Sequence, residues 1–229
     1  TAMPTEIPLS VLIPAHNPDP GRLDRVLRGL RAQTLPAGEY ETLLIDNAST
    51  RFPDTGSLAG AAPGNLTVIH EPALGLTSAR RAGFAAARGG IAVLVDDDNV
   101  LAPGYLAECL RLFAAHPRVG VLGGKSLPEF AKPPPEWARE FFPLLALRDP
   151  GSDPVITDAL RPAGAARNEY PACAPIGAGM ALRRAAWQAW LAARTGGPEL
   201  SDRRGTGLTS GGDNDIVFSA LRTGWSAAY

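Results

Sequence analysis

The feature that most constrains this chain is an alternation, through its first 125 residues, of short apolar runs with longer segments of helical periodicity. Short runs rich in branched side chains fit buried strands, whereas apolar residues spaced three or four apart fit helices that cover a sheet. Such a succession is typical of an α/β fold with a mostly parallel, Rossmann-like central sheet and helices on both faces. We place strands at 9–13, 42–45, 66–69, 91–95 and 118–122, and helices at 22–33, 77–88 and 103–115.

Beyond residue 125 the pattern becomes less regular. Prolines break any long element between 126 and 175, and a glycine-rich polar stretch at 195–212 is expected to be mobile. We expect a strand at 179–182, a helix at 184–193 and a last helix at 213–222. The chain stops at Tyr229 just where a further strand begins, so we expect a truncated C-terminus. The sequence predicts a single domain over 1–229.

The composition is that of a globular protein. Hydrophobic residues make up 45% of the 229 positions and charged residues 20%, which fits neither a disordered chain nor a membrane protein. The net charge of -1 gives no reason to expect nucleic acid as a partner. The two cysteines lack disulfide or zinc spacing, and no run approaches the roughly 20 apolar residues of a membrane span. We expect a cytoplasmic protein, with peripheral membrane association left open.

Three acids, Asp96, Asp97 and Asp98, follow the most apolar predicted strand. Carboxylates held this close repel one another and raise each other's pKa unless a cation lies among them. Hard oxygen ligands suit Mg²⁺ or Mn²⁺, and substrate phosphates commonly complete the shell of such an ion. The sequence therefore predicts a site for Mn²⁺ or Mg²⁺ and a nucleotide diphosphate. The alternative is a solvated turn that caps the next helix.

Other polar residues follow the carboxyl ends of neighbouring predicted strands. Ligands of open α/β sheets bind in the crevice beyond these ends. We therefore expect nucleotide-binding residues after the first, second and fourth strands, namely Pro14, Ala15, His16, Asn17, Asp46, Asp96 and Asp97.

Four of the candidate site residues each have a purely structural explanation beside the functional one. Asp46 can form a turn through its own backbone, or can accept the imide N–H of a uracil. Arg80 is either a surface arginine or a set of donors directed at the diphosphate or the base. Asp213 and Asp215 begin the last helix, where capping explains one acid. The other could act as a general base on an acceptor hydroxyl.

Taken together, these residues resemble the family 2 glycosyltransferases of the GT-A fold. The order and approximate spacing agree over the first 125 residues and again from Ile176 onward. The matching segments are Ser10 to Asn17, Gln33-Thr34, Leu44 to Ser49, Gly75 to Arg80, Val95 to Asn99, and Gly212 to Asp215 running into Ala220 to Trp225.

The resemblance implies an inverting transfer of a sugar from a nucleotide diphosphate donor. Uridine is the preferred base, with thymidine and guanosine left open. It implies that residues 1–125 bind the donor and that residues 126–229 bind the acceptor and carry the base. A single hexosyl transfer is expected, because the Gln-x-x-Arg-Trp signature of processive relatives is absent. The implied roles are nucleotide binding for Pro14, His16, Asp46 and Arg80, ribose binding for Asp97, metal binding for Asp98 and base catalysis for Asp213.

Two departures from the family pattern leave questions open. Gly212 replaces an acid that usually precedes the base, so Asp213 and Asp215 compete for this role. The family often supplies a histidine beyond the last helix, and the sequence ends before such a position. The competing functions are a nucleotidyltransferase acting on sugar phosphates and a non-catalytic sugar-nucleotide-binding protein. The acceptor, whether a glycan, a lipid-linked molecule or a small molecule, is not indicated.

Overall fold

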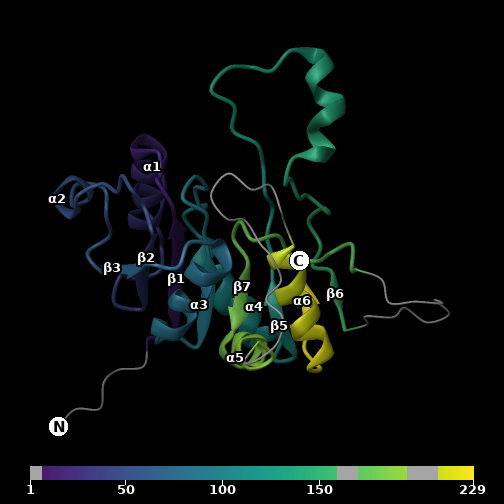
Figure 1. The fold of residues 1–229 in the computed structure, drawn as a ribbon. Helices are drawn as coiled ribbons and strands as arrows, with labels where there is room; N and C mark the ends of the chain where they lie inside the picture. Colours follow the sequence, from purple (N-terminus) through teal and green to yellow (C-terminus); the bar gives the residue numbers. More distant parts are fainter. Residues whose placement is uncertain (1–6, 159–169, 195–210) are drawn as a thin grey trace, which may run out of the picture.

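The computed structural model describes residues 7–158, 170–194 and 211–229, and one mixed sheet of eight strands forms the centre of this part (Figure 1). The sheet order is β3-β2-β1-β4-β7-β5-β8-β6. β7 and β6 run opposite to the other strands, so the predicted mostly parallel α/β fold is confirmed. The strands are β1 (Leu9–Ala15), β2 (Tyr40–Asn47), β3 (Leu66–Glu71), β4 (Ile91–Leu94), β5 (Val119–Leu122), β6 (Ile156–Thr157), β7 (Ala181–Arg183) and β8 (Ser226–Ala228).

Helices cover both faces of the sheet because its buried strands are apolar on both sides. On β1, Leu9, Val11 and Ile13 pack with α1 and α4, whereas Leu12 packs with α3, α5 and α6 on the opposite face. This division follows the two-residue period of a strand. The helices are α1 (Pro20–Arg31), α2 (Thr55–Leu58), α3 (Leu76–Ala86), α4 (Tyr105–Ala115), the 3₁₀ helix η1 (Glu136–Leu144), α5 (Arg184–Ala192) and α6 (Gly212–Arg222).

The chain reverses its direction across the sheet between β1 and β4. It first builds β2 and β3 on one side of β1 and then returns to place β4 on the other side. β1 and β4 are parallel with Leu12 opposite Leu94, and the Val95 N–H donates to the Leu12 carbonyl at 3.0 Å. The segments that leave these two strands therefore diverge from one edge, which is where open α/β sheets bind ligands.

The second half departs in places from the sequence prediction. The strand expected at 179–182 is β7, and it lies antiparallel between β4 and β5. The short α2 and β6 were not predicted, because elements of four and two residues are too short to show a period. The glycine-rich stretch predicted to be mobile lies outside the described residues, apart from Gly211 and Gly212.

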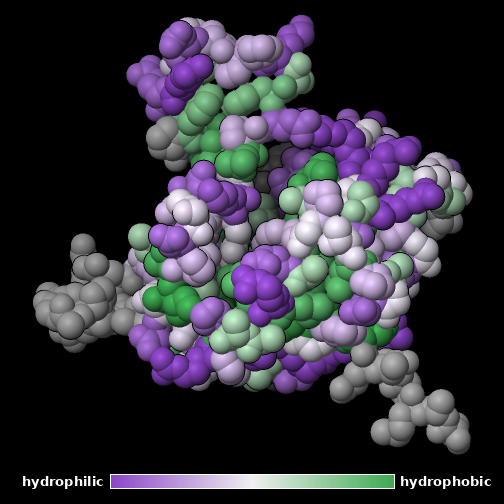
Figure 2. Space-filling view, turned by 180° about the vertical axis from the view of Figure 1, so that it is seen from behind, coloured by the Kyte–Doolittle hydropathy of each residue, from purple (hydrophilic) through white to green (hydrophobic). Residues whose placement is uncertain are grey.

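Residues 126–148 form an arm that projects from the body and carries η1 (Figure 1). Ser126 and Arg148 close its neck by exchanging two backbone hydrogen bonds of 2.8 and 3.1 Å, and Lys125 pairs with Asp149 at 2.7 Å. Figure 2 shows hydrophobic surface on the side of the arm nearest the body. The large hydrophobic residues exposed on the arm are Leu127, Phe130, Trp137, Phe141, Leu144 and Leu145.

Candidate functional site

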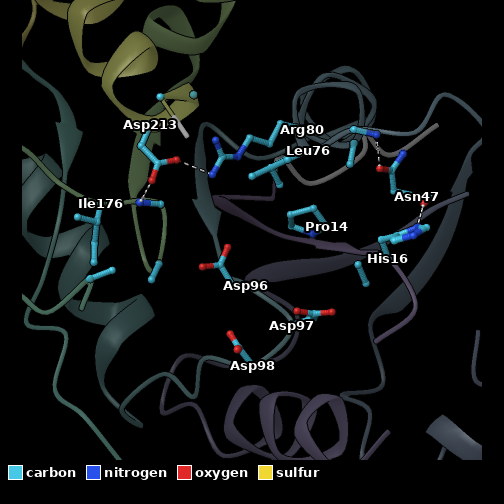
Figure 3. A pocket seen from close by; sticks show the side chains of 18 of the residues that line it. Pro14, His16, Asn47, Leu76, Arg80, Asp96, Asp97, Asp98, Ile176 and Asp213 are labelled. Carbon is cyan, nitrogen blue, oxygen red and sulfur yellow. Dashed lines mark hydrogen bonds and ion pairs between the residues drawn. The ribbon is translucent and has the colours of Figure 1, made fainter. Parts of the chain in front are cut away.

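A cavity of about 380 Å³ opens at the carboxyl edge of the sheet, beside the point where the chain reverses (Figure 3). Six parts of the chain line it: the end of β1, the end of β2, the region around the start of α3, the loop after β4, the segment before β7 and the start of α6. Ala146 of the arm is also at its wall. Among the predicted site residues, the cavity is lined by Pro14, Ala15, His16, Arg80, Asp96, Asp97, Asp98 and Asp213.

The three acids after β4 lie together on one wall of the cavity, below Pro14 in Figure 3. Burial, together with the charges of Asp98 and Asp96, raises the pKa of Asp97 to about 6. Arg22 reaches Asp98 at 3.4 Å, but both side chains are largely exposed, and ion pairs of this kind contribute little. The wall therefore carries negative charge that a bound cation would stabilise.

The described side chains by themselves make an incomplete metal site. Among them, no group of three or more His, Cys, Asp and Glu residues is arranged to bind an ion. One or two of the carboxylates after β4 nevertheless fit Mn²⁺ or Mg²⁺ if substrate oxygens complete the shell, which is how Mg²⁺ is usually bound with phosphates. The residues present therefore fit a cation that arrives with its substrate.

His16 and Asn17 form a bend directly after β1, but only His16 lines the cavity. His16 Nδ1 donates to the Asn47 carbonyl at 2.7 Å, and Nε2 accepts from Asn17 Nδ2 at 3.0 Å. These partners assign the neutral tautomer protonated at Nδ1. Asn17 has a positive φ of 49°, and its Oδ1 accepts from the backbone N–H of Thr50 and of Arg51, both at 2.9 Å. Asn17 thus supports the loop from behind.

The end of β2 brings Asn47, and not Asp46, to the wall of the cavity. Asp46 is 8% exposed, accepts from the Ser49 N–H at 3.1 Å and lies 3.1 Å from His70 Nδ1. Asn47 accepts from the Gly75 N–H at 2.8 Å and donates to the Ala73 carbonyl at 2.7 Å. Asn47 belongs to a segment that resembles the family, but the sequence predicts Asp46, not Asn47, as the site residue. The place of Asn47 directly after a predicted strand was the available signal.

Arg80 and Asp213 meet at the far wall of the cavity (Figure 3), where Gly177 also contacts Asp213. Arg80 Nη2 donates to Asp213 Oδ1 at 2.6 Å, and the Gly177 N–H donates to Oδ2 at 2.8 Å. The Arg80 side chain is 3% exposed and that of Asp213 is 35% exposed. The helix dipole at the start of α6 further favours a negative charge here. Asp213 is therefore a fixed and accessible carboxylate.

Asp215, the second acid of the α6 start, does not line the cavity. It accepts from Trp190 Nε1 at 2.8 Å and forms an ion pair with Arg194, both on the side of α5. The described geometry thus separates two acids that the sequence could not rank. It brings Asp213 to the cavity and places Asp215, like Asn17 and Asp46, away from its wall.

Residues 10–184 match the model of the family described as glycosyl transferase family 2. The succinoglycan biosynthesis protein ExoW of Rhizobium meliloti is 35% identical over 108 residues, which are 45% of this chain and 33% of that protein. An uncharacterized protein, MT1568, of Mycobacterium tuberculosis is 32% identical over 115 residues, or 49% of this chain and 34% of that protein. The matches thus span about a third of the length of these curated relatives.

Solved structures share the fold at low sequence identity. TarS residues 1–349 of S. aureus align with a TM-score of 0.60 and 17% identity, covering 96% of this chain and 57% of that one. The mannosyltransferase PcManGT from Pyrobaculum calidifontis, solved with GDP-Man and Mn²⁺, also gives a TM-score of 0.60, with 21% identity over 96% of this chain and 53% of that one.

Among the helices of the described ranges, none has the length and apolar character of a bilayer span.

These neighbours confirm the GT-A fold expected from the sequence. The family model covers most of the chain and contains the segments after β1 and β4 that line the cavity. The chain therefore belongs to glycosyl transferase family 2.

Proposed function

We propose that this chain catalyses transfer of one hexosyl group from a nucleoside diphosphate sugar to an acceptor hydroxyl, with inversion at the anomeric carbon. Membership of the family supports glycosyl transfer in general. The observation that carries the finer proposal is a single cavity that combines the loop after β1, the carboxylates after β4 and, opposite them, Asp213. These are the three parts needed to hold a nucleotide, to balance phosphate charge and to accept a proton.

The nucleoside is proposed to bind between the end of β1 and the start of α3. His16 donates to the Asn47 carbonyl, and both residues line one side of the proposed nucleoside site. Leu74, Gly75 and Leu76 line its other side. Uridine is the preferred base, because a TarS structure with UDP is among the neighbours at a TM-score of 0.54. Guanosine is the main competitor, because PcManGT was solved with GDP-Man. Asp97 is assigned to the ribose.

Asp98, with Asp96 or Asp97 beside it, is proposed to hold Mn²⁺ or Mg²⁺ together with the donor phosphates. Burial, and after it the neighbouring charges of Asp98 and Asp96, raises the pKa of Asp97, and a bound cation would relieve this repulsion. When bound, such an ion stabilises the negative charge that develops on the leaving diphosphate. The carboxylates themselves orient the diphosphate end of the donor towards the far wall, where Asp213 lies.

Asp213 is proposed as the general base. As the acceptor oxygen forms its bond to the anomeric carbon, the bond from that carbon to the diphosphate breaks, and the acceptor proton passes to the Asp213 carboxylate. Attack opposite the leaving group inverts the configuration. Arg80 and the Gly177 N–H each occupy one carboxylate oxygen, and each oxygen retains a further lone pair that can take the proton.

The second half of the chain is proposed to bind the acceptor in a single-domain enzyme. Ile176, Ala178 and Ala146 line the same cavity as Asp213, and none of them carries a charge. The hydrophobic arm that contains Ala146 extends this surface outward. A cytoplasmic location is proposed for the donor reaction, because nucleotide sugars are the expected substrates.

The first test is a thermal-shift panel of UDP, GDP and their sugars, each with and without Mn²⁺. A ligand that binds only the folded state raises the melting temperature, and we expect the largest rise for a uridine donor with metal. Asp98→Ala should abolish the metal-dependent part of this rise. An unchanged response in that variant would contradict the metal assignment.

The second test measures release of nucleoside diphosphate from the stabilising donor, with a panel of hydroxyl acceptors. Asp213→Asn should retain the thermal shift and lose transfer by about 10³-fold or more, because general base and orientation are both affected. Donor binding without turnover by the wild type would instead favour a non-catalytic binding protein. Release of pyrophosphate from a nucleoside triphosphate and a sugar phosphate would favour a nucleotidyltransferase.

A further inference from the structure

The first turn of α6 carries two acids that are held by different parts of the fold. Asp213 is bonded to Arg80 of α3 and to the Gly177 N–H before β7. Asp215 is bonded to the side of α5. Residues two apart in an α-helix project about 200° apart around its axis. The two acids therefore anchor nearly opposite sides of the same helical turn.

The partners of Asp215 form a compact and buried group at the end of α5. Trp190 is 1% exposed, and its Nε1 donates to Asp215 Oδ2 at 2.8 Å. Arg194 pairs with the same carboxylate, donates from Nη1 to the Trp190 carbonyl at 3.1 Å and lies over the Trp190 ring at 4.5 Å. The side chains of Arg194 and Asp215 are 11% and 19% exposed. This group, Trp190, Arg194 and Asp215, is called the α5 clamp below.

The α5 clamp leaves Asp215 poorly suited to accept a proton from substrate. Its carboxylate points away from the cavity wall and already accepts from an indole N–H and a guanidinium. Trp190 in turn is fixed by an edge-on contact with Phe84 of α3, with ring centroids 5.7 Å apart. Since Phe84 and Arg80 lie one turn apart on α3, the same helix supports both anchors of α6.

We propose that Asp215 is a positioning residue, which acts through the α5 clamp to fix the rotation of α6 and so the place of Asp213 at the cavity. This inference rests on the proposed role of Asp213 as general base. Buried residues such as Ile216 and Val217 hold the body of α6 on the sheet, but without Asp215 the acids of its first turn would be anchored on the Arg80 side alone. Displacement of a catalytic group by about 1 Å can cost about 10²-fold in rate. Asp215 supplies the second anchor.

The test compares three substitutions in the full chain by steady-state kinetics with the active donor. Asp215→Ala removes both bonds, Asp215→Asn retains an oxygen for the Trp190 N–H, and Trp190→Phe removes the donor but keeps an aromatic ring. We expect Asp215→Ala to lower kcat roughly 10- to 100-fold with donor KM within about 3-fold. Asp215→Asn should recover most of this loss. Trp190→Phe combined with Asp215→Ala should be no slower than Asp215→Ala alone, because coupled residues are not additive.

The opposite pattern would overturn the proposal. If Asp215→Asn is as inactive as Asp213→Asn while Trp190→Phe retains wild-type kcat, Asp215 is the base and not a positioning residue. Wild-type kcat in Asp215→Ala would equally refute the role.

A readout that needs no turnover separates this proposal from the proposed function. In protein labelled with 5-fluorotryptophan, the ¹⁹F signal missing from Trp190→Phe identifies Trp190. We expect it to move in Asp215→Ala and to move less in Asp215→Asn, and an unmoved signal would refute the clamp. If the wild type transfers sugar from no donor, the proposed function fails, and the ¹⁹F result still decides whether the clamp exists.

Discussion

Gly177 is the position where a single methyl group should impair the reaction most selectively. A Cβ at this position would lie 2.7 Å from Arg80 Nη2, 2.7 Å from Asp213 Oδ1 and 2.8 Å from Oδ2, whereas ordinary contact begins at 3.4 Å. The carboxylate and the guanidinium must therefore retreat by roughly 0.6 Å in Gly177→Ala, because packed interiors do not absorb such an overlap elsewhere. The bond from the Gly177 N–H to Asp213 lengthens at the same time.

The expected cost follows from both effects. A hydrogen bond to a charged group contributes about 1.5–3 kcal/mol, so the free energy of unfolding should fall by about that amount or less. Misplacement of the carboxylate by a large fraction of 1 Å should lower kcat roughly 10- to 100-fold. Donor KM should stay within about 3-fold, because the proposed nucleoside contacts lie on the other wall.

The assay is nucleoside diphosphate release under saturating donor and acceptor, beside urea unfolding of the same preparations. Gly64→Ala is the matched control, because a Cβ at Gly64 meets nothing within 4 Å, and it should keep wild-type kinetics. A Gly177→Ala protein with wild-type kcat would refute the proposed role of Asp213, since its carboxylate cannot keep its place beside the new methyl group.

Three further predictions concern parts of the molecule around the site. Asn47→Ala removes the bonds to Ala73 and to Gly75, and should weaken UDP binding about 10-fold or more by calorimetric titration; an unchanged affinity would contradict a supporting role for Asn47. Burial alone would raise the pKa of Glu41, but hydrogen bonds from Ser10 and Arg88 lower it. The Glu41 carboxylate therefore stabilises the fold at pH values above its ordinary pKa of 4.5, and this stabilisation is lost as the pH falls through the lowered pKa of the folded protein. Glu41→Gln should therefore unfold more easily in urea at pH 7, with the difference from wild type shrinking below pH 4; a constant difference would count against this reasoning. Trp187 is 1% exposed and stacks on Phe84 with ring centroids 5.6 Å apart. Trp187→Ala should therefore lower the free energy of unfolding by about 3–5 kcal/mol, and a loss below about 1 kcal/mol would contradict the place of Trp187 in the core.

The first half of the fold was predictable because its elements are long and periodic. The predicted bounds of strand β1 and helix α1 lie within a few residues of the observed ones. In α1 the signal was one buried stripe formed by Leu23, Val26, Leu27 and Leu30. Strand β7 was located, but its antiparallel insertion was not predicted. Its three residues alone carry no sign of direction, and its position depends on tertiary packing against β4 and β5.

The site could be predicted to the level of the crevice but not of individual side chains. Residues that follow parallel strands lie at the same edge of the sheet whichever way their side chains point. The sequence could therefore predict that Asp96, Asp97 and His16 line one crevice, as they do. Which of two neighbouring polar residues faces inward depends on local turns, as the exchange of Asp46 for Asn47 shows. The ranking of Asp213 over Asp215 needed the position of Trp190, which lies 23 residues or more away in sequence.

The closed neck of the arm has a consequence for how such a protein can diversify. Ser126 and Arg148 satisfy each other's backbone groups, so no residue between them contributes a strand to the central sheet. This insertion can change in length or composition, or be exchanged for that of another chain, while the eight-stranded frame of the described residues keeps its pairing. Under the proposed function, a change in the arm would therefore alter the choice of acceptor without altering the strand pairing of the sheet.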